Sequence, residues 1–592
     1  MKPFALFLLA ALLPASLRAQ DRLRIQEVGL QGYYSTDVPT PVRIHIPALP
    51  RSQTINLVFT VDSNYNEQAE RWLRTDRFEK PVQVISGQPL DVELPILLAG
   101  YGKLKSRVVE TDSQGGTLGE DDRDLSLVKM SPTIAIYCRE DSQCYEAQEQ
   151  IYPVQARKDA SNPSAALEFA LLKELWSDWL AYRAAGAVII AGSISAMTAD
   201  QGKALECYLR SGGILIILEK EAANTSFLSA YGQGAAHAWP ERVGKGFLYR
   251  LPSLKTHDLN KLFAEKGQYG QGRMIFSKGA SPSAVNWLLQ RISVSFTFPR
   301  LRWLLIWISV YILIIGVVNF AILRRLRKLE WGWVTVSVTA LVFSGGLYII
   351  SSWHRPRHFT LDGATVYWMD AHSPLAHEER GFRVSSPERT QLGLIIDDDV
   401  VLNTSLGIVS FRSSGVNVGS EMTDKQTMEP GWLVRLGPPL QLETPMLRWS
   451  FKDFYTEGFH EFPGTVHWTT AMHLKNDMGR SFREGIYLDY KAKKWYSIPG
   501  MAPGEEIDLA SLVPRDFYKP LPPFPLRMSK AVRPGIQRPF SINEFPNAGI
   551  RFAAADHVFA GVIEPAEKNA RLDAEGTTEQ NVALAVVLLD QP

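Results

Sequence analysis

The chain has 592 residues, which is too long for a single hydrophobic core and predicts roughly three or four domains. Hydrophobic residues make up 45% and charged residues 21%, so a largely disordered chain is excluded. Lysine and arginine number 63 against 62 aspartates and glutamates. This balance excludes both the basic excess of a nucleic-acid-binding protein and a solvating acidic tail.

The first residues follow the plan of a secretory signal peptide, which we place at residues 1–19. Lys2 supplies the positive start, an apolar run extends from Phe4 to Leu13, and Ala19 offers a small residue for cleavage. The apolar run would form a helix of about 15 Å, half the thickness of a bilayer core. It therefore predicts an export signal and not a membrane span.

Residues 20–130 contain short runs of alternating apolar and polar side chains, such as VRIHIP, INLVFTVDS and LDVELPILL. Proline, glycine and asparagine separate these runs, and no convincing helix lies between them. The pattern predicts a β-sandwich of the immunoglobulin-like type. Because no cluster of reactive side chains stands out, we expect an adhesive or spacer role for this domain.

Residues 131–300 predict an α/β domain of the flavodoxin-like class. PTIAIYC and AVIIAG are buried-strand runs, and ALEFALLKELWSDWLAY has apolar residues at helical spacing. Thr198 followed by Gln201 predicts a capping box that opens a helix, and Gly212-Gly213 predict its end before the strand ILIILE. Strand, helix and strand over roughly 32 residues form a βαβ unit, so we expect a mostly parallel sheet.

The helix of this unit should present one apolar face. Leu205 and Leu209 lie four residues apart and should therefore face the sheet. Lys203 and Arg210 should face the solvent. Gly212 should adopt a left-handed backbone conformation at the end of the helix.

The segment WSDWLAYRAAGAVIIAGSISAMTADQGKALECYLRSGGILIILEK resembles the glutamine-amidotransferase-like domain of an uncharacterised family of bacterial membrane proteins. The places of that family's Y-x-x-x-D, Q-x-x-A-L-x-x-Y/W and G-G-x-L patterns are taken here by Tyr182, Gln201, Ala204, Leu205, Tyr208, Gly212, Gly213 and Leu215. Gly186-Ala187 stand where the family has aspartate. VGKGFLYRLP and GVVNFAILRRLRKLEWGW are similar to its later strand turn and its membrane hairpin.

The resemblance covers about residues 130–350 and implies architecture more than activity. It implies an apparently non-catalytic domain of the class I amidotransferase-like type outside the cytoplasm. Genes of such proteins often lie beside MoxR-type ATPases, von Willebrand A proteins or ABC-type exporters, so the resemblance also implies a partner of that kind.

Two cysteines are the candidate nucleophiles of an amidotransferase, which needs a thiol on a tight strand-to-helix turn with an activating histidine and carboxylate. Cys207 falls in the middle of the expected helix, where no such turn exists. Cys138 ends a strand, but Arg139-Glu140-Asp141 follow it in place of a glycine, and neighbouring carboxylates disfavour a thiolate. Neither cysteine predicts thiol catalysis.

Hydroxyl and imidazole groups offer a second set of candidates. Ser193 and Ser195 follow AVIIAG near the edge where doubly wound sheets bind ligands, but Ile194 breaks the G-x-S-x-G pattern. We interpret these serines as turn and cap residues. His237 and His257 each stand alone in loop-like segments. We therefore expect no catalytic, cofactor-binding or metal-binding residues, no cofactor and no enzymatic activity.

The chain has three cysteines, too few for a disulfide-scaffolded fold or a zinc site. Cys138 and Cys144 are close enough for a local disulfide in an oxidising compartment. Two buried thiols are the alternative, because spacing alone does not define the geometry that a disulfide needs.

Residues 301–353 predict two transmembrane helices, at 303–323 and 332–353, because both stretches are apolar and uncharged. The loop 324–331 between them contains four cations, Arg324, Arg325, Arg327 and Lys328. Short basic loops stay in the cytoplasm, and an exported chain that crosses twice ends outside. Both arguments predict a two-pass protein of the bacterial inner membrane with most of its mass in the periplasm.

Residues 354–592 again read as β structure and predict an extracytoplasmic domain of the β-sandwich type. His460, His467 and His473 could meet at a metal across a hairpin, but alternation of this kind is typical of packed strands. ALAVVLLD near the end predicts a last buried strand.

Together these patterns favour a membrane-anchored scaffold of the bacterial envelope that is embedded in the lipid bilayer, binds an envelope protein and assists an ATPase or transport complex. The alternatives are a membrane-anchored hydrolase or amidotransferase-like enzyme, and a surface carbohydrate-binding protein. The enzyme requires a nucleophile, a base and oxyanion donors at the carboxyl edge of the α/β sheet. The carbohydrate-binding protein requires aromatic side chains aligned on one exposed β face.

Overall fold

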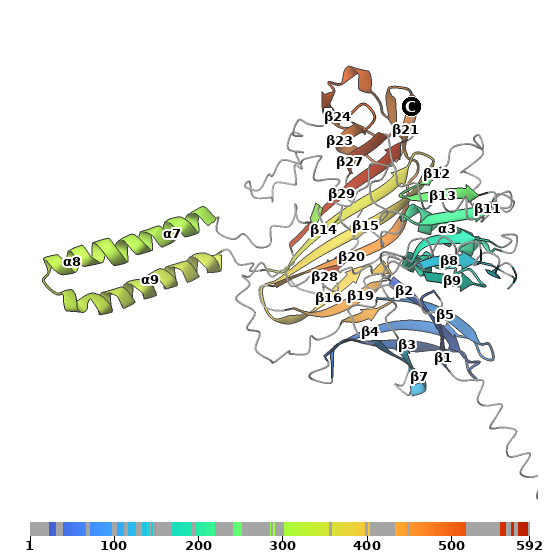
Figure 1. The fold of residues 1–592 in the computed structure, drawn as a ribbon, viewed down its shortest axis with the longest axis horizontal. Helices are drawn as coiled ribbons and strands as arrows, with labels where there is room; N and C mark the ends of the chain where they lie inside the picture. Colours follow the sequence, from blue (N-terminus) through green and yellow to red (C-terminus); the bar gives the residue numbers. More distant parts are fainter. Residues whose placement is uncertain are drawn as a thin grey trace, which may run out of the picture.

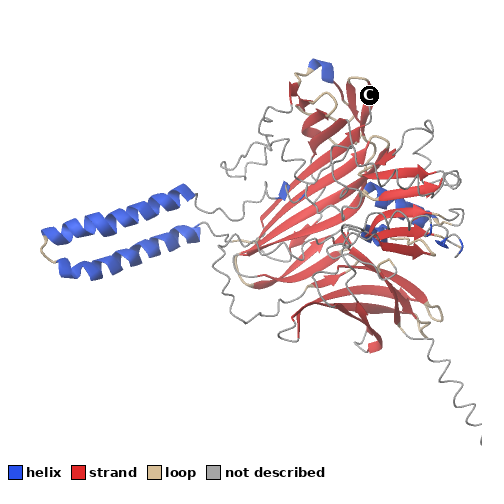
Figure 2. Cartoon of the chain, viewed as in Figure 1, coloured by secondary structure: helices blue, strands red, loops and turns tan. Residues whose placement is uncertain are grey.

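The computed structural model shows a chain built mainly of β-strands, with two long apolar helices that extend away from the sheets (Figure 1 and Figure 2). This confirms the expected multidomain, β-rich protein with a helical hairpin. The signal peptide predicted at 1–19 lies outside the described residues. The structure describes residues 23–30, 39–66, 71–97, 104–111, 117–125, 133–138, 140, 142, 144–145, 149, 168–191, 197–218, 241–251, 285, 288–289, 301–353, 358–396, 401–402, 432–437, 439–446, 450–516, 557–563, 570–572 and 578–589.

The N-terminal region is β structure, as its alternating pattern predicts. One small antiparallel sheet has the order β1-β2-β5, with the strands Arg24–Val28, Pro39–Ile46 and Leu90–Leu97. Four further strands, β3 (Gln53–Asn66), β4 (Arg71–Val84), β6 (Leu104–Thr111) and β7 (Thr117–Leu125), enter a larger sheet. In β2, Val42, Ile44 and Ile46 point to the core at every second position, which explains why this segment forms a strand.

The larger sheet has eight strands and joins the two ends of the chain. Its order is β28-β16-β19-β18-β4-β3-β6-β7. The C-terminal half contributes β16 (Thr390–Ile396), β18 (Leu433–Arg435), β19 (Leu440–Met446) and β28 (Ala570–Leu572). Strand β18 pairs in parallel with β4, with Leu433 opposite Arg77. The expected domains 20–130 and 354–592 therefore share a sheet. The immunoglobulin-like character of the first and the β-sandwich type of the second stay predictions.

The α/β region forms a six-stranded sheet of order β12-β13-β11-β10-β8-β9, parallel except for the β12–β13 hairpin. Its strands are β8 (Thr133–Tyr137), β9 (Glu168–Leu172), β10 (Ala185–Ile190), β11 (Ile214–Leu218), β12 (Glu241–Val243) and β13 (Gly246–Leu251). Helix α3 (Ala199–Arg210) connects β10 to β11, which confirms the βαβ unit. Thr198 and Gln201 form the predicted capping box.

One element of this region was expected to be different. The segment ALEFALLKELWSDWLAY predicts a helix, but the structure contains β9 followed by a short 3-10 helix, η2 (Trp179–Ala184). Strand β9 pairs in parallel with β8, and its buried residues alternate, as Ala170 and Leu172 show. The helical prediction is wrong because a short apolar run fits either period, and pairing with a neighbouring strand decides between them.

The C-terminal region forms a nine-stranded sheet of order β17-β20-β15-β14-β29-β27-β23-β24-β26. The long strands are β14 (Thr360–Asp370), β15 (Ser373–Ser386), β20 (Ser450–Glu461) and β29 (Thr578–Leu589). The others are β17 (Val401–Leu402), β23 (Phe482–Asp489), β24 (Lys494–Ile498), β26 (Arg515–Asp516) and β27 (His557–Ile563). The predicted last buried strand is β29, which pairs in parallel with β14 in the middle of the sheet.

One hydrophobic core unites the β part of the molecule. It contains Phe59 of the eight-stranded sheet, Ile44 of the small N-terminal sheet, and Val366 and Phe454 of the nine-stranded sheet. A second core fills the α/β region. A third packs a small sheet against the nine-stranded sheet, and its elements are β21 (Val466–Thr470), β22 (His473–Asn476), β25 (Glu506–Asp508) and the 3-10 helix Leu509–Ser511.

The hairpin consists of α7 (Leu301–Leu313), a π-helical turn (Ile314–Val318), α8 (Asn319–Arg325), a 3-10 turn (Leu329–Trp331) and α9 (Gly332–Trp353). Its two arms, Leu305–Arg325 and Leu329–Ile349, are long and apolar enough to cross a membrane. The most apolar stretch of each arm is not buried against the rest of the described structure. The arms approach closely at Gly346, where a Cβ would lie 3.0 Å from the ring of Trp307.

Candidate functional site: the interface between the α/β region and the nine-stranded sheet

The residues that carry the family resemblance pack around two buried tyrosines. The hydroxyl of Tyr182 accepts a hydrogen bond from the backbone N–H of Trp176 at 2.8 Å and donates one to the Trp176 carbonyl at 3.0 Å. The hydroxyl of Tyr208 donates to the Ala185 carbonyl and accepts from the N–H of Ile214, both at 3.3 Å. The Tyr182 hydroxyl thus binds both backbone groups of Trp176, and the Tyr208 hydroxyl joins two backbone segments, so both tyrosines have structural roles.

The glycines of the same patterns make room for this packing. A Cβ on Gly213 would lie 2.3 Å from the ring of Tyr208, so no larger residue fits there without a shift. At Gly244, on the β12–β13 turn, φ is +56° and a Cβ would lie 2.9 Å from the Cα of Arg210. Residues 243–251 of the segment VGKGFLYRLP therefore belong to the β12–β13 hairpin, which closes over the end of α3.

Gln201 connects the start of α3 to the segment before η2. Its side-chain oxygen accepts from the N–H of Thr198 at 3.0 Å, and its amide group donates to the Leu175 carbonyl at 2.8 Å. Asp178 caps η2 by accepting from the N–H of Leu180 at 3.0 Å. Burial raises the pKa of Asp178 above its ordinary value. These contacts hold η2 against α3 in one orientation.

The 3-10 helix η2 carries two side chains that reach the nine-stranded sheet. The guanidinium of Arg183 donates to the carboxylate of Glu457 on β20 at 2.8 Å, and both side chains are almost fully buried. The ring of Trp179 meets Phe459 edge-on, with centroids 5.1 Å apart, and meets His377 at 6.2 Å. Residues of the family pattern therefore position a docking element.

Arg210, at the end of α3, makes the second contact, and its predicted orientation toward solvent is wrong. Its side chain is 1% exposed. The guanidinium donates to Asp370 on β14 at 3.0 Å and to Glu206 on its own helix at 2.9 Å. Asp370 also accepts from the backbone N–H of Gly244 at 2.9 Å. The helix face that looks solvated in the sequence is covered by another part of the chain.

Lys245, beside Gly244, makes the third contact, with Glu379 on β15 at 2.5 Å. Its ammonium also lies 4.9 Å from the centre of the Trp368 ring. The α/β side of the interface thus supplies the cations Arg183, Arg210 and Lys245, and the sheet supplies Glu457, Asp370 and Glu379. The attraction within a buried ion pair only slightly exceeds the free-energy cost of removing its two charges from water. This set of pairs therefore contributes more to the specificity of the docking orientation than to stability.

His377 on β15 lies beside two of these pairs, Arg183–Glu457 and Lys245–Glu379, and is fully buried. Its Nε2 is 3.7 Å from Glu457 and its Nδ1 is 3.9 Å from Glu379. Burial lowers the pKa of His377 below its ordinary value, against the opposing pull of the two carboxylates. Burial alone would raise the pKa of Glu457, but the charge of Arg183 outweighs it and holds that pKa well below the usual range.

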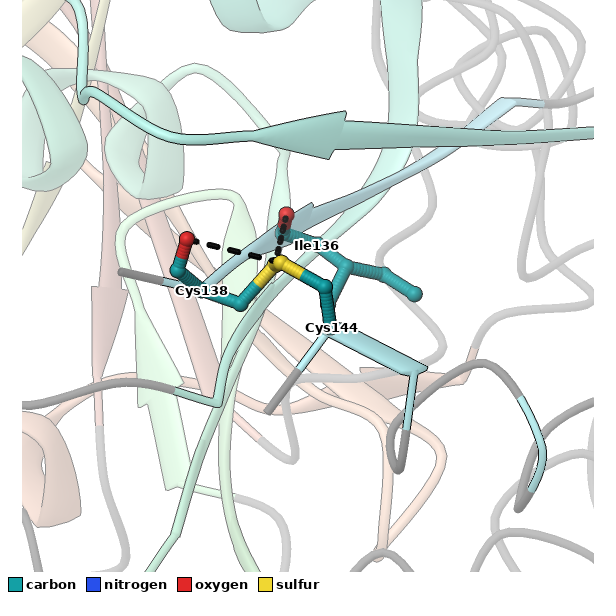
Figure 3. The surroundings of a disulfide bond; sticks show 3 residues. All are labelled: Ile136, Cys138 and Cys144. Carbon is teal, nitrogen blue, oxygen red and sulfur yellow. Dashed lines mark hydrogen bonds between the residues drawn. A yellow bond between two sulfur atoms is a disulfide. The ribbon is translucent and has the colours of Figure 1, made fainter. Parts of the chain in front are cut away.

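The cysteines lack the properties of a nucleophile. Burial, with the carboxylate of Glu206 nearby, raises the pKa of Cys207 to about 12, so its thiol stays protonated. Cys138 forms a disulfide with Cys144, with Cα atoms 5.3 Å apart, at the carboxyl end of β8 (Figure 3). The sequence left open a disulfide or two buried thiols for this pair, and the structure contains the disulfide. Ser193, Ser195, His237 and His257 lie outside the described residues.

The C-terminal histidines do not converge. His460 packs against Phe462 and Tyr367, with ring centroids 4.6 and 5.6 Å away. His467 lies 3.7 Å from Asp477, and His473 contacts the hydroxyl of Thr470. Within the described ranges, no group of three or more histidine, cysteine, aspartate or glutamate side chains has the arrangement of a metal site.

The sequence contains one overlooked signal for this interface. His377-Glu378-Glu379-Arg380 form an unbroken polar run inside a long strand, where period-two alternation should expose every second residue. All four are buried instead. Arg380 and Glu378 pair with each other at 2.6 Å on one face, while His377 and Glu379 contact the α/β region on the other. A strand with such a run must be covered on both faces.

The fold is that of a multidomain, β-rich protein with a hairpin of two potential membrane spans. No protein-family model and no curated protein sequence matches the chain.

Three of the solved structures that resemble parts of this chain have TM-scores too low to indicate a shared fold. A Pseudomonas fluorescens alkylpurine DNA glycosylase is 12% identical over 18% of this chain and 30% of its own, with a TM-score of 0.14. A Paenibacillus cycloisomaltooligosaccharide glucanotransferase is 11% identical over 33% and 27%, with a TM-score of 0.16. A yeast delta-COP-I mu-homology domain is 7% identical over 40% and 97%, with a TM-score of 0.15. The chain thus spans less than a third of the length of the first two.

Proposed function

We propose that this chain is a membrane-anchored, extracytoplasmic scaffold of the bacterial envelope, in which a non-catalytic amidotransferase-like domain is fixed to a β body. One observation carries the proposal: the residues of the family pattern bind one another and position η2, whose Trp179 and Arg183 dock on the nine-stranded sheet. The pattern is thus used for assembly.

The chemistry of the cysteines supports the same proposal. An enzyme of the amidotransferase type needs a reactive thiolate, whereas Cys207 is buried and protonated and Cys138 is bridged to Cys144. The disulfide also supports an oxidising compartment for the α/β region. That inference is independent of the basic loop Arg324–Lys328, whose charge favours the cytoplasmic side, and the two agree.

The partner we propose is a membrane ATPase or transport complex. The resemblance to proteins whose genes lie beside such complexes supports this class. A hairpin without an internal ionisable residue offers no ion or substrate pathway of its own, which also favours an accessory role.

Complementation of a deletion strain tests the scaffold against the enzyme. Ser193→Ala and Cys207→Ala should restore the wild-type phenotype fully, because neither side chain has a chemical role. Arg183→Glu should fail, because it places a carboxylate against Glu457, and the exchange Arg183→Glu with Glu457→Arg should recover part of the function. Immunoblots must show equal abundance for every variant.

Loss of function in Ser193→Ala or Cys207→Ala at normal abundance would support the alternative that the chain is an enzyme. The partner is tested separately, by cross-linking the tagged full-length chain in native membranes and identifying the products by mass spectrometry. Recovery of an ATPase or exporter subunit with the wild type, and its reduction with Arg183→Glu, is the expected result. Recovery of neither class would contradict the proposed partner.

A further inference from the structure

The docking interface contains a titratable side chain beside its three close ion pairs. His377 is fully buried, and neither ring nitrogen makes a hydrogen bond within the protein. Trp179 of η2 meets the ring at nearly a right angle, and Phe459 of β20 lies 5.3 Å away between centroids. The imidazole is therefore enclosed by groups from both sides of the interface.

The charges around His377 already balance. Glu457 is paired with Arg183 at 2.8 Å, and Glu379 is paired with Lys245 at 2.5 Å. These four groups, from β20, η2, β15 and the β12–β13 turn, sum to zero when the imidazole is neutral. A proton on His377 would add a net positive charge to a fully buried site. The nearest carboxylates, Glu457 at 3.7 Å and Glu379 at 3.9 Å, already pair with cations that lie closer to them.

We propose that His377 is the proton sensor of an acid-sensitive latch, which releases the α/β region from the nine-stranded sheet when its imidazole becomes protonated. The geometry requires this coupling, because η2 covers the imidazole in the docked state. Undocking exposes the ring to water, where the imidazolium is well solvated. Acid therefore favours the undocked state.

The sign and the pH window follow from linkage. An exposed histidine titrates near about pH 6.5, and docking lowers the pKa of His377. Docking is therefore strongest above about pH 6.5 and weakens as the pH falls below that value, by up to tenfold per unit. Glu457 stays ionised throughout this window, because its pKa is held well below the usual range. At pH 5.5 we expect an opening constant about tenfold larger than at pH 7.5.

The backbone amide of Gly244 reports on the latch directly, because its N–H donates across the interface to Asp370. Hydrogen exchange would be measured by mass spectrometry on the full-length chain in nanodiscs, at pH 7.5 and 5.5, with correction for intrinsic exchange. The protection factor of the Gly244 amide should be about tenfold lower at pH 5.5 than at pH 7.5. Phe247, whose N–H donates to Gly213 inside the α/β region, is the control in the same hairpin and should not change.

His377→Gln removes the titration and should make the protection of Gly244 equal at both pH values. If that variant does not fold, His377→Phe serves the same purpose, because Trp179 and Phe459 already surround the ring. Unchanged protection in the wild type, increased protection in acid, or the same acid loss in the histidine variants would each overturn the proposal. Equal losses at Gly244 and Phe247 would also overturn it, because they indicate general unfolding.

Discussion

At the end of α3, Arg210 places its guanidinium between Glu206 of its own helix and Asp370 of β14. The same Asp370 side chain accepts from the N–H of Gly244, and its backbone carbonyl accepts from the hydroxyl of Thr465 at 3.0 Å. Asp370 thus ties together a helix, a turn and two parts of the C-terminal region. Such a buried, shared contact is sensitive to the loss of any one member.

Arg210→Ala should destabilise the α/β region by about 3–5 kcal/mol, because it leaves the carboxylate of Asp370 buried without its cation. Lys203→Ala, on the exposed face of the same helix, is the matched control and should change stability by less than about 0.5 kcal/mol. Denaturant titration of the full-length chain in detergent, read by proteolytic cleavage of the α/β region, measures both. Equal shifts for the two variants would contradict the burial of Arg210.

At the scale of elements, the βαβ unit is held by contacts between the end of α3 and the start of β11. Leu205 and Leu209 are 1% and 0% exposed and face the core, as predicted from their spacing. The ring of Tyr208 fills the space above Gly213, and its hydroxyl binds the backbone of β10 and β11. Gly212, with φ at +111°, ends the helix in the predicted conformation.

Gly213→Ala should therefore cost about 1–3 kcal/mol or more, because its methyl group would overlap the Tyr208 ring. Tyr208→Leu alone should also destabilise, through the loss of the ring and both hydrogen bonds. In the double variant the methyl group has room. Its loss of stability should therefore be smaller than the sum of the losses in the two single variants, by a coupling energy of about 0.5–3 kcal/mol. Strict additivity in denaturant unfolding would show that the ring and the glycine are not in contact.

At the scale of the whole molecule, β14 connects the hairpin to the docking interface. It begins a few residues after α9, runs through the middle of the nine-stranded sheet and ends at Asp370 (Figure 1). The strand pairs with β15 and β29 along its length. The base of the hairpin and the sheet side of the docking interface are therefore joined by one strand that is paired on both sides.

The proposed topology predicts which cysteine substitutions a membrane-impermeant thiol reagent can reach in intact cells. Arg325→Cys, at the end of α8 in the basic segment between the arms, should be labelled only after the membrane is permeabilised, because short basic segments stay in the cytoplasm. Lys203→Cys and Lys494→Cys, both exposed, should be labelled from outside. Background labelling should be low, since Cys207 is buried and Cys138 and Cys144 are bridged. Labelling of Arg325→Cys in intact cells would refute the topology.

Features that depend on neighbouring residues were determined by the sequence itself. Long uncharged apolar stretches predicted the hairpin, alternation predicted strands such as β2, and Thr198, Gln201 and Gly212 predicted the ends of α3. These features are local, because they arise from hydrogen bonds and side-chain contacts within a few residues. The sequence also showed why Cys207 could not serve as an elbow nucleophile.

Only the tertiary structure decided which surfaces meet. The pairing of β18 with β4, the conversion of a helix-like run into β9, and the burial of Arg210 and His377 all depend on distant segments. A charged side chain looks solvated in any local pattern, and it becomes buried when another region supplies the opposite charge and covers it. The candidate site lies between two parts of the chain, so its residues became recognisable only when those parts were brought together.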